Sequence, residues 1–482
     1  MELDFTNPFE YSDLQKQLYF PNINEELTSR HSYDLSKRSF SSHRKVKMDY
    51  LIDENNNNND ENNNENNNEI TYIVSKKFDS LINCEMITQL PSVKVKDKYK
   101  DSVEICYPHN LGHHIITKGI LKINGDIYQT IDSQVLDINS KYYKQNVLYD
   151  EMVGNIKCLT QWNTKLPGYP VNTPQPWLFT KNPNTGLLIL QTDVNITFTF
   201  SRRIKLNELL RMRIRTPSGK CKIVPCNLSY LDLPKNVDEI PIPEMWSKYS
   251  LFTDEERRWR KQSLSSPSYY PNVQKIKHEI WYEDYINCNN NNNDIGMLGE
   301  VIKIPLKSKS LVRHIFWMGQ NLNSIKYNDF SNYTTNTNLF KGFTPCSKIS
   351  LSYSPISSIS SDDSNDSDEE VNKKINKEIY RIKELPYYHF TRSEAYDFFK
   401  YVSTEPGYSV YTYGYNPYSV NADSSVDIST FNVNLIIKLE DTDIFNNKSK
   451  ENDKYIVHVR MAVYRKIEIK LNEENQLVYK LS

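Results

Sequence analysis

Hydrophobic and polar residues alternate every two positions in several segments of this chain. In Asn195–Ser201 (NITFTFS) the isoleucine and both phenylalanines fall on one face, and the polar residues fall on the other. A two-residue period is that of a β-strand with one buried face. Residues 433–439 and 457–471 alternate in the same way near the C-terminus. The chain is therefore expected to be rich in half-buried strands.

A turn signal joins two of these strands. Asn124–Gly125 separates the apolar-rich segments Ile115–Ile123 and Asp126–Ile131. Asn-Gly favours a two-residue hairpin turn, because both central positions of a type I′ turn need positive φ. This part of the chain is predicted to be a β-hairpin.

Helical patterns are confined to two short pieces, Phe252–Gln262 and Arg392–Tyr401. In the first, Thr253 is placed as the N-cap and Glu256 follows three residues later, which makes a capping box. Many strands, long polar loops and little helix predict an all-β protein of antiparallel sandwiches. One sandwich takes about 150 residues, so the β-rich part of the chain fits two.

Four segments interrupt or precede the strand pattern. They are the polar residues 1–50, the Asn run with acids at Asp53–Glu69, a second Asn run at Asn287–Asn293 and the acidic Ser-rich segment Ser352–Glu370. The two Asn runs are expected to be loop inserts, the first of them disordered. The acidic segment reads as an exposed loop in which phosphorylation is chemically feasible.

Basic residues gather in the first segment, from Arg30 to Lys47. Two interpretations stay open. One is a solvated, partly disordered arm, and the other is an arm that touches an anionic lipid or nucleic-acid surface. The formal net charge of −1 gives the whole chain no general attraction to nucleic acid or membrane.

The composition favours strands and gives no sign of a disulfide framework. The chain has 34 Tyr and 13 Gly, and aromatic side chains pack well on a pleated surface. Its 7 Cys are scattered, and Cys221 and Cys226 have no second pair at the spacing of a zinc site. With no signal peptide in view, we expect reduced thiols in a cytosolic setting. The longest apolar runs, such as Gly186–Leu190, are too short to span a bilayer, which predicts a soluble protein.

A search for catalytic groups finds two candidates. His109, His113 and His114 (HNLGHH) form the densest histidine group, but no further ligand lies at a useful spacing, so a surface patch between loop and strand is expected. The acids of Asp254–Glu256 precede Arg257, Arg258 and Arg260; without a cleft they form only a charged helix surface with i,i+3 and i,i+4 pairs. We predict no catalytic residue, no metal site, no cofactor and no enzymatic activity.

Several segments resemble, in chain order, the double jelly-roll major capsid proteins of nucleocytoplasmic large DNA viruses. The resemblance is carried by Ile115–Ile131 (early hairpin), Pro176–Phe179, Gly186–Gln191, Asn195–Phe200, Phe252–Arg260 (FTDEERRWR), Val273–Trp281, Leu311–Gln320 (LVRHIFWMGQ), Tyr387–Ser429 and Tyr455–Ile469 (final strand pair). In the stretch Gly407–Ser429 a strand runs into Asn-Pro, a small polar loop and then Asp-Ile-Ser. The series covers roughly residues 110–470.

The chain also departs from the family pattern. The opening Gly-Asn-Pro and hydrophobic-Tyr-Arg-Arg-His segments are not recognisable, and Asn421–Ser424 stands where the late loop has Pro-Ser-Gly. These gaps favour a divergent or paralogous member. The Asn runs suit an AT-rich genome, such as that of an amoeba-infecting giant virus or of an amoeba that carries viral genes.

The resemblance implies an all-β fold of two tandem antiparallel jelly-roll sandwiches, with long loop insertions and few short helices. The expected domains are an N-terminal arm (1–70), a first jelly roll (71–220) and a second (221–482) that carries the inserts at 287–293 and 352–370.

The implied function is that of a capsid protein whose homotrimers form pseudo-hexagonal capsomers of an icosahedral shell. Its expected partners are itself, neighbouring capsomers, minor capsid proteins and the inner membrane through the basic arm, with no specific nucleic acid. The expected location is the virion, after assembly in the host cytoplasm. Two alternatives remain, a membrane-coating assembly scaffold of the same fold and a β-sandwich module that binds carbohydrate or another ligand.

Overall fold

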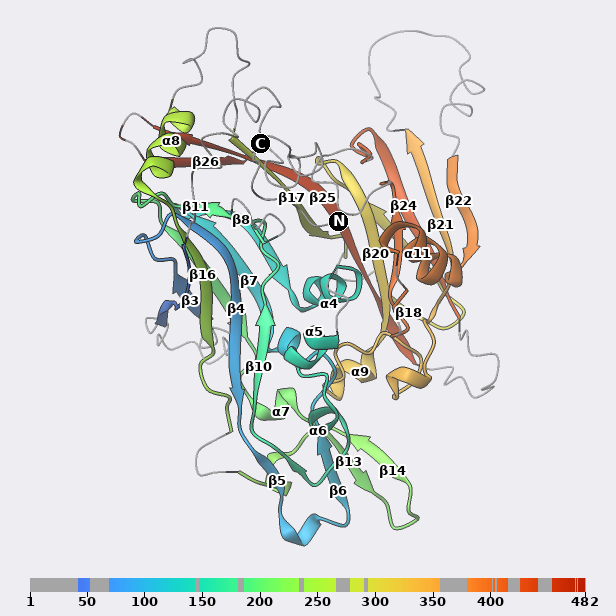
Figure 1. The fold of residues 1–482 in the computed structure, drawn as a ribbon. Coiled ribbons are helices and arrows are strands. Elements are labelled where there is room, and N and C mark those ends of the chain that lie inside the picture. The colour runs from blue at the N-terminus through green and yellow to red at the C-terminus, as the bar shows by residue number, and fades with distance from the viewer. Residues whose placement is uncertain are drawn as a thin grey trace, which may run out of the picture.

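The strands of the protein form antiparallel sheets arranged in two large sandwiches and a smaller lobe (Figure 1). The computed structural model describes residues 42–52, 69–143, 147–180, 186–233, 238–265, 278–289, 294–355, 379–400, 402–403, 405–414, 425–440 and 453–481, except 473 and 475. The predicted inserts at Asp53–Glu69 and Ser352–Glu370 and the loop tip Asn421–Ser424 lie largely or wholly outside these residues.

The first sandwich packs two sheets with strand orders β1-β16-β4-β10 and β2-β3-β12-β7-β8, and β11 adds to β4. Its strands are β1 (Ser42–Lys47), β2 (Asp49–Ile52), β3 (Glu69–Ile73), β4 (Ser80–Leu90), β7 (Ile116–Ile123), β8 (Asp126–Asp132), β10 (Tyr169–Pro174), β11 (Leu187–Leu188), β12 (Ile196–Arg202) and β16 (Glu244–Leu251). Side chains from both sheets, among them Met86, Phe198 and Tyr249, form one core.

The second sandwich has strand orders β17-β25-β20-β23 and β19-β24-β21-β22, and β18 and β26 add to β25. Its strands are β17 (His278–Asn287), β18 (Ile295–Met297), β19 (Val301–Leu306), β20 (Val312–Asn321), β21 (Cys346–Pro355), β22 (Ile379–Pro386), β23 (Ser409–Thr412), β24 (Phe431–Leu439), β25 (Lys454–Leu471) and β26 (Leu477–Leu481). Its core includes Ile304, Trp317 and Leu435.

Both sandwiches have the same topology. When β2, β11, β18 and β26 are set aside, eight principal strands remain in each. Numbered along the chain, they run 1-8-3-6 in one sheet and 2-7-4-5 in the other, in both sandwiches. Eight antiparallel strands in two facing sheets with this wrapped order form a jelly roll. The prediction of two tandem jelly rolls is confirmed.

The strand pairing differs from the predicted domain bounds at both ends of the first jelly roll. Its last principal strand, β16, lies after residue 220, and its first, β1, lies before residue 71. Part of the predicted basic arm is therefore sheet. Lys45 pairs with Glu85 and Lys47 with Glu244. The lysines of β1 suggested an arm outside the fold. An edge strand, however, exposes one face and one edge to water, so it can carry lysines there.

A third core lies below the first jelly roll in Figure 1, and the sequence analysis did not predict it. Two small sheets, β15-β5-β9 and β14-β13-β6, enclose it. We call this part the distal lobe; it contains β5 (Val93–Val95), η3 (Asp97–Tyr99), β6 (Val103–Cys106), α6 (Lys157–Thr160), β9 (Lys165–Leu166), α7 (Leu206–Leu209), β13 (Arg211–Arg215), β14 (Cys221–Val224), η4 (Leu228–Tyr230) and β15 (Leu231–Asp232). Long insertions between jelly-roll strands form the lobe, which agrees with the expected loop insertions.

Local sequence signals are found where they were expected. Strand β12 alternates buried and half-buried residues along its whole length. Asn124 and Gly125 join β7 to β8 with φ of 52° and 94°, as a type I′ turn requires. The expected final strand pair at Tyr455–Ile469 is instead one strand of 18 residues, β25. Its N-terminal part lies in the core of the second jelly roll, whereas Ile467 and Ile469 lie in the core of the first.

The helices are short, as predicted, but they are not confined to the two predicted pieces, since α4 (Ser133–Tyr142) and several single-turn helices lie elsewhere. α8 (Asp254–Ser265) follows β16, and its Glu256 backbone N–H donates to the Thr253 hydroxyl at 3.2 Å, which confirms Thr253 as the cap. The second helical piece is η6 (His389–Ser393) followed by α11 (Glu394–Phe399).

The charged surface of α8 has a further contact that spacing alone did not indicate. Arg257 donates to both carboxylate oxygens of the fully buried Asp79 at 2.6 and 3.0 Å, and the backbone N–H of Phe252 donates to the same carboxylate at 2.8 Å. Asp79 precedes β4, so this clamp fixes α8 on the end of the first jelly roll.

We expect Asp79→Ala to lower the free energy of unfolding by about 2 kcal/mol, because it leaves the buried backbone N–H of Phe252 without an acceptor and removes two hydrogen bonds of Arg257, which keeps its contact with Asp254 at 2.7 Å. Urea unfolding followed by tryptophan fluorescence measures the change. Asp193→Ala is the matched control, since Asp193 is 85% exposed and lies 3.6 Å from Lys76; it should cost less than about 0.5 kcal/mol. Equal losses in both variants would contradict the clamp.

Candidate functional site at the domain interface

A buried helix lies between the two jelly rolls. α4 (Ser133–Tyr142) follows β8, and every residue from Val135 to Tyr142 is buried. The Asp132 carboxylate caps the helix by accepting from the Val135 N–H at 2.9 Å, and its other oxygen accepts from Arg460 of β25 at 2.7 Å. Ile138 and Tyr142 pack with Phe316 of the second jelly roll. A helix that is buried on all sides must have every polar side chain paired.

Among these polar groups, the Asp137 carboxylate needs the most hydrogen-bond donors, because it is charged and fully buried. Its Oδ1 atom accepts from His113 Nδ1 at 2.6 Å and Asn110 Nδ2 at 3.0 Å. Its Oδ2 atom accepts from the Ser331 hydroxyl at 2.9 Å and the Tyr333 hydroxyl at 3.1 Å. An ionised carboxylate has about four acceptor positions, so all of them are occupied. Two donors come from the first jelly roll and two from the second.

These contacts decide the charge state of the cluster. Burial by itself raises the pKa of Asp137, but the nearby histidines and the hydrogen bonds from His113 and Ser331 hold this pKa below its usual value. Burial lowers the pKa of His114 to about 3, so its ring is neutral near pH 7. His114 Nε2 then donates to the Ser331 hydroxyl, 2.5 Å away, while Ser331 donates to Asp137. The cluster thus contains one carboxylate that accepts four hydrogen bonds, with a neutral His114 beside it.

The HNLGHH motif is therefore not the surface patch that we predicted. His113 and His114 are buried on α3 (Leu111–Ile115), and His109 lies against Phe340 with a ring separation of 5.2 Å. The prediction failed because the partners of these histidines are more than 20 residues away in sequence, at Asp137 and Ser331. No spacing rule connects them.

The cluster contains a serine, a histidine and an aspartate, yet it is not arranged for nucleophilic catalysis. A triad needs a base between the nucleophile and the carboxylate, with room for a substrate. Here Ser331 donates directly to Asp137, and the side chains of Ser331 and His114 are both about 1% exposed. Among the described residues, no group of three or more His, Cys, Asp or Glu side chains could hold a metal ion. The arrangement supports a structural role.

Other polar contacts cross the same interface. Arg211 of the distal lobe pairs with Asp329 at 2.9 Å, and Asn328 donates to the carbonyl oxygens of Asn207 and Leu210 at 2.7 Å. These contacts join the distal lobe to the loop after α9 (Leu322–Lys326). The second jelly roll is therefore fixed to the first at the distal lobe as well as at α4.

Tyrosine hydroxyls connect the two jelly rolls at the other end of the interface. Tyr128 donates to the carbonyl oxygen of Tyr479 at 2.7 Å, Tyr282 donates to that of Tyr128 at 2.8 Å, and Tyr479 donates to that of Leu188. Their rings lie in the core shared with the first jelly roll. Buried tyrosine suits this place because its ring is apolar and its hydroxyl still finds an acceptor.

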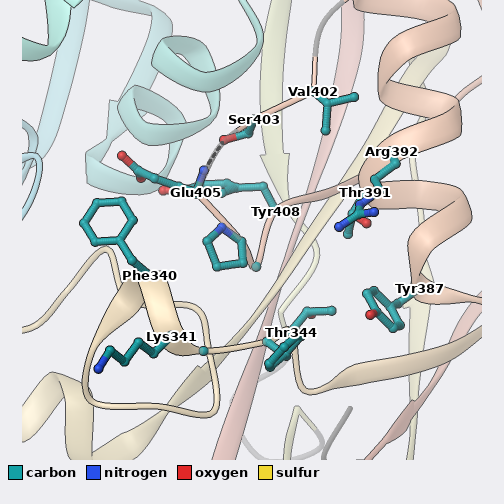
Figure 2. Close-up of a pocket in the computed structure, with 14 residues that line it drawn as sticks. Phe340, Lys341, Thr344, Tyr387, Thr391, Arg392, Val402, Ser403, Glu405 and Tyr408 are labelled. Atoms are coloured by element: carbon teal, nitrogen blue, oxygen red, sulfur yellow. Dashed lines mark hydrogen bonds between the residues drawn. The ribbon is translucent and has the colours of Figure 1, made fainter. Parts of the chain in front are cut away.

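A cleft of about 290 Å³ opens beside the interface, lined only by residues of the second jelly roll (Figure 2). Phe340 and Lys341 lie on one side, and Tyr387 and Arg392 on the other. The described residues that line the cleft include no histidine and no cysteine. Glu405, which also lines it, is buried and pairs with Lys141 of α4 at 2.7 Å.

The loop that carries Glu405 depends on a glycine. Gly407 has φ of 103°, which favours glycine, and a Cβ at this position would collide with the backbone carbonyl oxygen of Tyr333. Gly407 belongs to the stretch that most suggested a viral resemblance. It brings the chain against Tyr333 of the buried cluster, and β23 begins two residues later.

Cys221 and Cys226 both lie in the distal lobe, Cys221 exposed and Cys226 partly exposed, and each is a free thiol. No helix in the part of the chain that the structure describes is both long enough and apolar enough to cross a membrane.

Asp137→Ala should lower the free energy of unfolding by about 3 kcal/mol or more, since it leaves four buried donors without an acceptor. Asp137→Asn should cost less, because the amide keeps one acceptor and the two hydroxyls can rotate to accept from its NH2 group. Asp150→Ala is the control, with a half-exposed carboxylate 4.0 Å from Lys141. Urea unfolding distinguishes the three variants. A loss in Asp137→Ala no larger than that of the control would exclude the cluster as a main stabiliser.

Acid should destabilise the protein from about pH 6.5 downward. Burial lowers the pKa of His114 and of His458 to about 3, so the unfolded chain binds protons there before the folded protein does. Each histidine then removes up to about 1.4 kcal/mol of stability per pH unit. Asp284 partly opposes this, because burial raises its pKa to about 6 and the folded protein takes up a proton between about pH 6 and 4.

His458→Gln tests this pH dependence, since glutamine can still bond to Gln320, which lies 2.9 Å from His458 Nε2. Urea midpoints at pH 7, 6, 5 and 4 should fall less steeply in the variant than in the unchanged protein. Parallel slopes would show that His458 does not stay neutral in the fold.

The chain has no match among family models, and no curated protein matches it. Solved structures do match. "Crystal structure of PBCV-1 VP54 fitted into a cryo-EM reconstruction of the virophage Sputnik" gives a TM-score of 0.59 at 9% identity and covers 92% of this chain and 98% of that one. "PBCV-1 virus capsid, quasi-atomic model" gives 0.58 at 11% identity with the same coverage.

"Faustovirus major capsid protein" gives a TM-score of 0.58 at 9% identity and covers 89% of this chain and 91% of that one. In each case the match extends over both jelly rolls rather than one. Identities of 9–11% carry no information about activity, but the agreement in fold covers nearly the whole length of both chains. The chain therefore has the double jelly-roll fold of viral capsid proteins.

Proposed function

We propose that this chain is a structural capsid protein of a large DNA virus and not an enzyme. The observation that supports this most strongly is the repetition of one strand order, 1-8-3-6 against 2-7-4-5, in two sandwiches of one chain. Two similar wedges per chain give six in a trimer, which makes a pseudo-hexagonal tile. Closed cyclic symmetry limits such a trimer to three copies, and its edges remain free to tile a shell.

Exposed apolar side chains on edge strands support contacts between copies. Leu51 of β2 is 61% exposed, and Ile379 of β22 is 61% exposed. Val301 of β19, another edge strand, is 59% exposed. Edge strands with apolar side chains favour pairing with another chain unless something covers them. In the proposed shell, neighbouring capsid chains cover them.

We further propose two functional units, with principal strands from β1 to β16 and from β17 to β25, in place of the predicted division at residues 220 and 221. We now define the basic arm as only the residues before β1. They include Arg30, Lys37 and Arg38, which lie outside the described residues. This arm is proposed to face the inner membrane. The other proposed partners are neighbouring capsomers and minor capsid proteins. The proposed location is the virion, after assembly in the host cytoplasm.

The proposal predicts a trimer. Light scattering on the purified protein should give three times the mass of one chain, and negative-stain microscopy should show hexagonal outlines. Leu51→Lys and Ile379→Lys together should weaken the trimer without unfolding the chain. Phe340→Lys is the control, because Phe340 is 62% exposed and lies on η5 (Leu339–Lys341), which belongs to none of the sheets. A strictly monomeric protein that binds glycans would favour the binding-module alternative.

A further inference from the structure

The distal lobe ends in two turns that lie side by side. Strands β6 and β13 pair in register at Val103 and Ile214, and the Arg215 N–H donates to the Ser102 carbonyl oxygen at 2.7 Å. The turn before β6, which contains η3, therefore lies next to the turn that joins β13 to β14. In Figure 1 the strands β5, β6, β13 and β14 lie together at the lower end of the molecule.

Basic residues concentrate at this end. We call them the basic tip: Lys96, Lys98, Lys100, Arg215, Lys220 and Lys222. The acidic residues in the same two turns are Asp97 and Asp101, so the tip has a net charge of +4, whereas the whole chain has a net charge of −1. Asp97 is shared between Lys94 at 3.2 Å and Lys100 at 2.6 Å. Lys98, Arg215, Lys220 and Lys222 have no ion-pair partner among the described residues.

The lobe fixes the turn that carries Lys96, Lys98 and Lys100. The Lys96 ammonium donates to the Ser229 carbonyl oxygen at 2.8 Å, and the Tyr99 ring packs edge-on against Tyr230 at 4.8 Å. Both contacts tie the turn to η4 above the lobe's apolar core. Like charges held close together repel, and a bound polyanion relieves that repulsion.

We propose that the basic tip binds a flexible sulfated polysaccharide. Lysine ammonium groups act as point charges that can meet sulfates in many orientations, whereas they lack the planar fork that arginine offers to phosphate. A protruding pair of turns can touch only a few phosphates of a duplex, because DNA is stiff over about 150 base pairs. Proteins that bind single strands usually stack the bases on free aromatic rings. At the tip, the Lys98 ammonium lies 4.6 Å from the Tyr99 ring centre and Tyr230 packs against the same ring.

The test is binding of the full chain to heparin, with Lys98→Glu, Lys100→Glu and Lys220→Glu combined in one variant. The control reverses three exposed lysines of the second jelly roll, Lys307→Glu, Lys309→Glu and Lys326→Glu, so both variants carry the same net charge. Both are compared with the unchanged protein at equal oligomeric state, checked by light scattering. The tip variant should lose about tenfold or more in affinity, and the slope of log affinity against log salt should fall by about 3. The control variant should keep the affinity and the salt slope of the unchanged protein.

Two further probes separate charge from other chemistry. Dextran sulfate should compete with heparin and unsulfated dextran should not. A single-stranded oligonucleotide of equal charge should bind more weakly than heparin. The proposal is overturned if the control variant loses as much affinity as the tip variant, if unsulfated dextran competes equally, or if the oligonucleotide binds more tightly. None of these outcomes depends on whether the chain forms trimers.

Discussion

The Asp137 carboxylate is the most extensively hydrogen-bonded of the buried polar groups that join the two jelly rolls. Asp137 lies on a helix with no solvent-exposed face, and it takes two hydrogen bonds from each half of the chain. A buried charge is costly unless its acceptor positions are filled, so the Ser331 and Tyr333 hydroxyls cannot move away without a large loss of stability. The apolar core at one end of the interface and the Arg211–Asp329 pair at the other act in the same direction. The two halves therefore have one preferred arrangement.

The sequence predicted correctly those strands, turns and caps whose signals come from residues close together in the chain. Alternation located β12 and β24, Asn124–Gly125 located a hairpin turn, and Thr253 located a helix cap, because each signal is contained within a few residues. The jelly-roll architecture came from the order of several weak motifs rather than from any one of them. Its agreement with the observed strand order shows that order along a chain carries more information than any single motif does.

The predictions were wrong for residues whose contact partners lie far away along the chain. His113 and His114 were expected at the surface, yet they are buried because Asp137 and Ser331 satisfy them. Lys45 and Lys47 were expected in a basic arm, either solvated or touching an anionic surface, yet they lie in an edge strand opposite Glu85 and Glu244. The distal lobe was missed for a related reason. Its core is assembled from short pieces of three insertions, none of which has a hydrophobic pattern long enough to predict a domain.

Strand β25 gives the two jelly rolls a common mechanical element. It supplies Val457 and Val459 to one core and Ile467 and Ile469 to the other, without a break in the backbone. Force applied to one sandwich is therefore transmitted to the other through β25 and its hydrogen-bonded neighbours, and not through a flexible linker. Neither sandwich can then unfold while the other keeps its full core.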